Sequence, residues 1–139
     1  MNIGAECVFH NVSLGDLGQI RRYVRETAVA GGCNAEAVDE LIVAVNEAAA
    51  NIVRHGYQNE LGEIKVTVVC SEDRITVTLL DYSPGFDPTT VPSPDMTRPL
   101  DERPFGGMGV HIMRTFCDEL SYCRDPRGGN ELILLKRIV

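Results

Sequence analysis

The chain has 139 residues, which is about the size of one ordinary domain. Hydrophobic residues make up 44% and charged residues 24%, a composition that supports a packed core and excludes disorder along the whole length. The net charge of −7 argues against nucleic acid as a partner, because DNA and RNA binding depends on clustered Lys and Arg. We therefore expect one globular domain, residues 1–139, that does not bind nucleic acid.

The sequence also predicts a cytoplasmic protein that does not enter a membrane. The N-terminus has no basic segment followed by an apolar run, so no signal peptide is expected. No stretch approaches the roughly 20 apolar residues that are needed to cross a bilayer. The five cysteines are an odd number without CxxC spacing, which favours reduced, mostly buried thiols over a disulfide framework.

The first part of the chain predicts a strand followed by two helices. A short apolar run at residues 6–9 is typical of a strand. Ser13 can cap a helix whose apolar residues repeat at helical spacing, and the two glycines at residues 31–32 end it. Asn34 caps a longer amphipathic helix, which ends at Gly56.

A hairpin and a long loop follow. Alternating apolar residues predict two strands at residues 64–70 and 74–80, joined by a short polar turn. Residues 83–109 hold six of the seven prolines and few aliphatic residues. A segment of this length and composition inside a compact domain is typical of a functional lid or a mobile linker.

The chain then returns to regular structure. Residues 110–116 have helical spacing, and two strands at residues 120–124 and 131–139 flank a turn that contains Pro and Gly. Strands that mostly follow one another through tight turns favour an antiparallel or mixed, mostly antiparallel sheet with the helices on one face. The predicted fold class is therefore α+β, a two-layer α/β sandwich.

Two polar residues on the long helix are candidates for chemistry. Glu47 and Asn51 are four residues apart, so they share one helix face with His55, away from the apolar stripe. The three alanines between them would let a bulky group approach. A solvated helix face is the alternative interpretation of these residues. Asn weighs against it slightly, because its side chain competes for the helix backbone.

Two further motifs lie at the ends of predicted elements. Asp81 ends an apolar strand, where a carboxylate can accept a hydrogen bond from a ligand amino group or can simply form a turn. The glycine run from Gly106 to Gly109 opens a helix. Glycines let the backbone approach phosphates, and a helix N-terminus attracts anions, although flexible loops are also Gly-rich.

In this order, the three motifs resemble the ATP-binding fold shared by DNA gyrase, heat-shock-90 chaperones, sensor histidine kinases and mismatch-repair ATPases. Residues 47–57, EAAANIVRHGY, are similar to the same region of the anti-sigma-factor serine kinases. The resemblance runs from about Asn34 to the C-terminus. It implies a histidine-kinase-like ATPase fold that binds ATP and Mg²⁺.

The resemblance implies a role for each residue on the long helix and the first hairpin. Glu47 would be the catalytic general base for an attacking hydroxyl group. Asn51 would be the Mg²⁺ ligand, because its amide oxygen is a hard donor. Asp81 would accept the adenine amino group, and Gly85 would let the base sit close.

The remaining implied contacts concern the phosphates and the base. Gly107 and Gly109, with Met108 between them, would hold the phosphates beneath an ATP lid at about residues 86–106. Arg103 is a candidate cation for the γ-phosphate, with a solvated loop arginine as the alternative. Asn130 would bond a water that bridges to the base.

Two positions depart from the family pattern, and one residue receives a structural interpretation. The family usually has glycine where Ser83 stands, and threonine where Asn130 stands. His55 precedes Gly56, so we interpret it as a residue at the helix C-terminus that bonds carbonyl groups, in preference to a catalytic base.

The resemblance implies a protein-serine/threonine kinase that acts as an anti-sigma regulatory switch. Its substrate would be a small anti-anti-sigma antagonist protein, and a sigma factor would be a second partner. Relatives of this kind often form homodimers. The alternative hypothesis is a catalytically inactive, ATP-responsive binding module that sequesters a regulatory partner.

Overall fold

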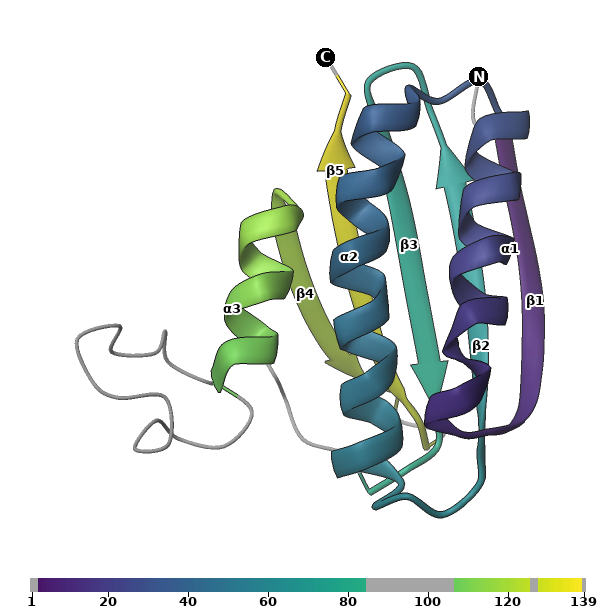
Figure 1. Cartoon of the computed structure of the whole chain (residues 1–139), viewed down its shortest axis with the longest axis vertical. Coiled ribbons are helices and arrows are strands. Elements are labelled where there is room, and N and C mark those ends of the chain that lie inside the picture. Colours follow the sequence, from purple (N-terminus) through teal and green to yellow (C-terminus); the bar gives the residue numbers. More distant parts are fainter. Residues whose placement is uncertain (1–2, 85–106, 126–127, 139) are drawn as a thin grey trace.

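The computed structural model describes residues 3–84, 107–125 and 128–138, in which three α-helices cover one face of a five-stranded sheet (Figure 1). The predicted α+β two-layer architecture is confirmed. The elements in chain order are β1 (Ile3–Val12), η1 (Leu14–Asp16), α1 (Leu17–Ala30), α2 (Ala35–Asn51), η2 (Ile52–Gly56), β2 (Gly62–Cys70), β3 (Arg74–Asp81), α3 (Gly107–Phe116), β4 (Glu119–Arg124) and β5 (Asn130–Arg137).

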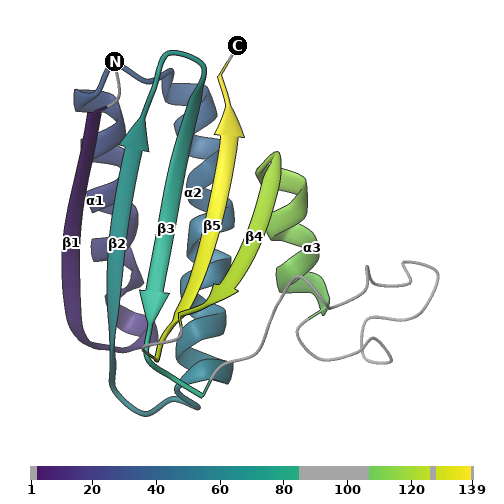
Figure 2. The ribbon, with the colours of Figure 1, turned by 180° about the vertical axis from the view of Figure 1, so that it is seen from behind.

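The strand order in the sheet is β1-β2-β3-β5-β4, and each neighbouring pair is antiparallel. The sequence left an antiparallel and a mixed sheet open, and the described strands form the antiparallel one. β5 lies between β3 and β4 in the sheet, although it follows both of them in the sequence. After β3 the chain therefore continues to α3 and the edge strand β4, and it then turns back to form β5 between the two strands. Figure 2 shows the opposite face of the sheet, which carries no helix of the described residues.

The core lies between the sheet and the helices. Alternate residues of β2 and β3, such as Val66 and Val77, are fully buried against the helix layer. From the other side, α2 buries Leu41 and Val45. Each fully buried aliphatic side chain of this kind contributes roughly 1.5–3 kcal/mol of transfer free energy. This two-sided burial fixes where α2 runs across the sheet.

The predicted start of α2 is confirmed in detail. Asn34 Oδ1 accepts hydrogen bonds from the backbone N–H groups of Glu36 (2.9 Å) and Ala37 (3.2 Å). These bonds satisfy two of the donors that a helix N-terminus leaves unpaired. At the other end, the chain continues beyond Asn51 as the five-residue π-helix η2. The N–H of Tyr57 bonds the carbonyl of Ile52 at 2.8 Å, and this wider turn was not predicted.

β1 is longer than the strand predicted from the apolar run. It pairs with β2 from Ile3, opposite Cys70, to Val12, opposite Gly62. A register shift between Phe9 and Val12 marks an irregularity near its end. The additional residues are held by backbone pairing, which the pattern of apolar side chains does not report.

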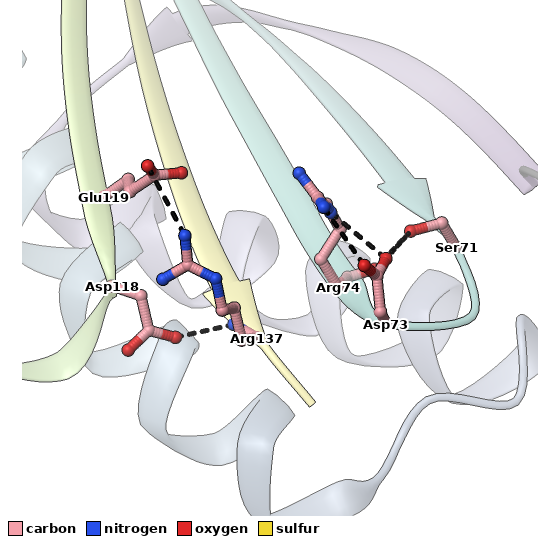
Figure 3. A network of polar contacts seen from close by, with 6 residues as sticks. All are labelled: Ser71, Asp73, Arg74, Asp118, Glu119 and Arg137. Carbon is pink, nitrogen blue, oxygen red and sulfur yellow. Dashed lines mark hydrogen bonds and ion pairs between the residues drawn. The ribbon is translucent and has the colours of Figure 1, made fainter. Parts of the chain in front are cut away.

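Polar contacts hold the end of the sheet where β2 turns into β3 and β5 ends (Figure 3). Arg74 and Asp73 form an ion pair at 3.0 Å, and Arg137 pairs with Glu119 at 3.5 Å. The N–H of Arg137 also bonds Asp118 Oδ2 at 2.6 Å. These side chains are exposed, so each ion pair contributes little to stability.

None of the helices within the described residues is both long and apolar enough to span a bilayer.

Candidate functional site

A pocket lies at the end of the sheet opposite those ion pairs, where the last turns of α2 and η2 meet the ends of β3, β4 and β5. Its empty space, part of which is open to solvent, is about 380 Å³, and it is lined by Ala48, Asn51, Ile52, Gly56, Asp81, Ser83, Met113, Tyr122, Asn130 and Leu132. The lining is mainly apolar, with a few buried polar side chains that converge from different elements. Such a lining is typical of sites that bind small organic ligands.

Asp81 presents a carboxylate to this pocket. It is the last residue of β3, and its side chain is only 4% exposed, on the helix-facing side of the sheet. Its Oδ1 accepts hydrogen bonds from Ser83 N (2.9 Å), Ser83 Oγ (2.6 Å) and Asn130 Nδ2 (3.1 Å). All the bonds that described residues make to this carboxylate end on Oδ1. The oxygen left for a ligand donor, such as an amino group, is therefore Oδ2.

Asn130 lies directly opposite Asp81 in the β3–β5 register. Its amide nitrogen donates to Asp81 Oδ1 and, at 2.8 Å, to the Ser83 carbonyl oxygen. Its amide oxygen accepts from Tyr122 Oη at 2.6 Å and Arg124 Nη1 at 2.9 Å. The structure thus places Asn130 in the pocket lining with its amide occupied by protein partners, and the predicted water-mediated contact to the base stays a prediction.

Asn51 offers a second buried polar group on the α2 side of the pocket. It is 6% exposed, and its Nδ2 has no hydrogen-bond partner among the described residues. An unpaired buried amide costs roughly 1–3 kcal/mol, so this position favours a polar ligand. Rotation of the amide by 180° exchanges nitrogen and oxygen, and the same position then offers an oxygen to a cation.

Gly109, in the first turn of α3, lies against both predicted α2 residues. A Cβ added to Gly109 would be 3.3 Å from Asn51 Nδ2 and 3.4 Å from Glu47 Oε2. The predicted opening of a helix by glycines is confirmed, because α3 begins at Gly107, which Met108 separates from Gly109. Two motifs separated by more than 50 residues along the chain therefore meet here, and the absence of a side chain on Gly109 permits the approach.

The residues present fit a Mg²⁺ ion. Mg²⁺ takes oxygen ligands and is held in phosphate-binding sites by one or two protein groups together with phosphate oxygens and waters. Asn51 supplies an amide oxygen of this kind beside Gly109, and the Glu47 carboxylate lies next to it. Within the described ranges, no cluster of three or more His, Cys, Asp or Glu side chains could form an all-protein metal cage.

Part of the predicted site cannot be placed. Gly85, Gly106, Arg103 and the predicted lid at about residues 86–106 lie outside the described residues. His55 lies in η2, is half-buried, and is not among the residues that line the pocket. Burial, and secondarily the charge of Arg54, lowers the pKa of His55, which favours its neutral form at pH 7. Its structural role stays a prediction.

Several lining residues had no signal of their own in the sequence. Met113 and Leu132 have the spacing of ordinary core positions, and they reach the pocket only because α3 and β5 pack around it.

The structural role of Tyr57, which lies outside the pocket lining, was also not predicted from the sequence. Its Oη donates to the Glu63 carbonyl at 2.6 Å and accepts from the N–H of Tyr82 at 2.9 Å, which ties the loop after η2 to the residue that follows Asp81.

Gly56→Ala is expected to lower the free energy of unfolding by about 1–3 kcal/mol. A Cβ at Gly56 would lie 2.5 Å from Ser83 Oγ and 3.2 Å from Ser83 Cβ, so Ser83 would have to leave the position from which it bonds Asp81. Urea unfolding measures the loss. In a Ser83→Gly background the overlap is absent, and Gly56→Ala should cost much less. An equal cost in both backgrounds would rule out this contact as the cause.

Comparison with known proteins agrees with the geometry. Residues 11–136 match the family model described as the histidine kinase-like ATPase domain. Relatives named serine-protein kinase RsbW, from Bacillus cereus (strain AH187), Bacillus mycoides (strain KBAB4) and Bacillus thuringiensis subsp. konkukian (strain 97-27), are 28% identical over 105 residues. The matched region covers 73% of this chain and 64% of each relative, so the chain spans less than two thirds of their length.

These matches confirm the resemblance drawn from the sequence. The family match covers nearly the whole chain, and it includes Glu47, Asn51, Asp81, Gly109 and Asn130. The similarity to serine-protein kinases agrees with the helix motif at residues 47–57. The pocket between α2, α3 and the sheet is thus the candidate ligand site of an ATPase-type domain. The chain belongs to the histidine kinase-like ATPase domain family.

Proposed function

We propose that this chain is an ATP-dependent protein-serine/threonine kinase that acts as an anti-sigma regulatory switch. Its substrate is a small anti-anti-sigma antagonist protein, and a sigma factor is its second partner. The observation that carries the proposal is the approach of Gly109 to Glu47 and Asn51, because a carboxylate beside a metal-ligand amide suits phosphoryl transfer. The similarity to serine-protein kinases supports the same activity.

The pocket binds the adenine base of ATP in this proposal. Asp81 Oδ2 accepts a hydrogen bond from the 6-amino group, while Leu132 and Met113 contact the ring. Guanine presents a carbonyl oxygen at the same position, which the carboxylate repels. The first turn of α3, at Gly107 and Gly109, provides backbone N–H groups and a helix N-terminus for the phosphates.

Glu47 accepts the proton of the attacking serine or threonine hydroxyl. The hydroxyl oxygen forms a bond to the γ-phosphorus, and the bond from that phosphorus to the oxygen of ADP breaks. Asn51 would hold Mg²⁺, which would neutralise charge on the phosphate oxygens, and Glu47 stays free to accept the proton. The remaining work of the protein is to position the two reactants, as in other phosphoryl transfers.

The proposal includes a cytoplasmic location. The cysteines at positions 7, 33, 70, 117 and 123 are all free thiols, which suits a reducing compartment. Burial raises the pKa of Cys117 to about 11, so this thiol stays protonated and unreactive at neutral pH.

A catalytically inactive, ATP-responsive binding module is the second candidate. Glu47 is not among the residues that line the pocket, so nucleotide binding through Asp81 and Asn51 does not require it. Such a module would bind its partner when ATP is present and would transfer no phosphate.

Titration calorimetry with ATP and GTP, with and without Mg²⁺, tests nucleotide binding. We expect ATP to bind in the presence of Mg²⁺ and GTP to bind about 100-fold more weakly, because Asp81 opposes the guanine carbonyl. Incubation with labelled ATP and candidate anti-anti-sigma domains should then label a partner serine or threonine. A stable complex without labelling would favour the binding module. Absence of ATP binding would exclude both functions.

A further inference from the structure

Asn130 is held in a single orientation by four hydrogen bonds. A side-chain amide has two N–H donors and an oxygen with two lone pairs, and all four positions are used here. The nitrogen donates to Asp81 and to the Ser83 carbonyl, and the oxygen accepts from Tyr122 and Arg124. The reverse orientation would set the amide nitrogen against the guanidinium, which cannot accept, and the amide oxygen against a carboxylate.

These bonds form a row across three strands. Arg124 on β4 lies opposite Asn130 on β5, and Asn130 lies opposite Asp81 on β3. Arg124 Nη1 also donates to the Pro84 carbonyl at 3.0 Å, so one guanidinium group holds both Asn130 and the chain that follows Asp81. The Arg124 guanidinium at one end and the Asp81 carboxylate at the other polarise the Asn130 amide between them. This polarisation strengthens the bond from Arg124 to Asn130 and the bond from Asn130 to Asp81.

This row determines which oxygen of Asp81 meets a ligand. Asn130 and Ser83 together supply three donors to Oδ1. With Oδ1 held, the carboxylate plane is fixed and Oδ2 remains for the pocket. Arg124 is exposed and does not line the pocket, so any effect it has on the ligand acts through Asn130 and the Pro84 carbonyl.

We propose that Arg124 and Asn130 are positioning residues that set the base selectivity of the pocket by orienting Asp81. The inference rests on the proposed binding of ATP. The two residues act on the 6-amino group through Asp81 and do not bond it themselves. Asn130 uses its whole amide on protein partners, and Arg124 does not line the pocket. They therefore act on discrimination between bases and not on the transfer step at Glu47.

The matched pair Arg124→Gln and Arg137→Gln tests this proposal on the full chain. Both arginines are exposed and lie in the β4–β5 hairpin, but Arg137 pairs with Glu119 at the far end of the sheet (Figure 3). Calorimetry should compare ATP with purine riboside triphosphate, which lacks the 6-amino group. We expect Arg124→Gln to weaken ATP binding by about 3- to 10-fold, while Arg137→Gln stays within about twofold of the wild type.

The ratio between the two nucleotides separates positioning from general damage. Arg124→Gln should leave the affinity for purine riboside triphosphate within about twofold, so that the preference for ATP shrinks. Equal weakening of both nucleotides, or no change in either, would overturn the proposal. If the wild type binds ATP without preferring it over the analogue, then Asp81 does not read the amino group and this inference fails alone. If the wild type binds neither nucleotide, the proposed function fails.

Asn130→Thr provides a second, independent variant. Threonine keeps one hydroxyl, which replaces at most two of the four bonds of the amide. We expect a loss of ATP preference at least as large as that of Arg124→Gln, and we expect the rate of transfer at saturating ATP to stay within about threefold, since Glu47 is untouched. A large fall in that rate with an unchanged nucleotide preference would instead place Asn130 in the transfer step.

Discussion

Replacement of Glu47 by glutamine is expected to lower phosphate transfer to the protein partner by about 10²- to 10⁴-fold while ATP affinity changes little. Glutamine has the shape of glutamate and preserves the close approach to Gly109. A Cβ added to Gly109 would lie 3.4 Å from Glu47 Oε2. A neutral amide, however, cannot take the proton of the attacking hydroxyl. Single-turnover transfer of labelled phosphate at saturating ATP measures the rate, and calorimetry measures the affinity.

Asp39→Asn is the matched control for the loss of one negative charge from α2. Asp39 lies two turns before Glu47 and forms an exposed ion pair with Arg25 at 3.2 Å. Because exposed pairs contribute little, the control should transfer phosphate within about twofold of the wild-type rate. A Glu47→Gln variant that keeps more than a tenth of the wild-type rate would remove Glu47 as the general base, although the chain would still be a kinase.

The residues on α2 were predictable because the information about them is local. The spacing of Glu47 and Asn51 places them on one helix face whatever the tertiary structure. The cap at Asn34 and the alternation of β2 and β3 are likewise properties of short segments, and the structure confirms both. Gly109 differs, because its approach to α2 depends on how α3 packs. The glycine run alone fitted a flexible loop equally well, and only its order with the other motifs favoured a ligand site.

The role of Asn130 could not be read from the sequence for a related reason. Its four bonds depend on the register of three strands, which sets Arg124, Asn130 and Asp81 in one row. Without that register, only the family resemblance suggested a role for Asn130, as a residue that bonds a water bridging to the base. The π-helical turn of η2 is similar in kind. It brings Gly56 against Ser83, and the sequence around each of these residues does not predict that contact.

Asp81→Asn is expected to lower ATP affinity by about 100-fold and to raise the affinity for inosine triphosphate relative to ATP. Two of the groups that donate to Asp81 Oδ1, Ser83 N and Asn130 Nδ2, cannot accept a hydrogen bond. The amide oxygen of the new asparagine must therefore take the position of Oδ1, which turns its NH₂ group into the pocket. The NH₂ group of the asparagine, a hydrogen-bond donor, then faces the base in the place of Asp81 Oδ2, which is an acceptor.

The two nucleotides respond to that change in opposite directions. The 6-amino group of adenine is a donor and would meet a donor, whereas the 6-carbonyl oxygen of hypoxanthine can accept from the new amide. Asp73→Asn, in the exposed turn between β2 and β3, controls for the loss of one negative charge far from the pocket. A fold damaged around the pocket would bind both nucleotides more weakly. Only a reversal in their ratio, with an unchanged urea midpoint, follows from an amide whose orientation Ser83 and Asn130 impose.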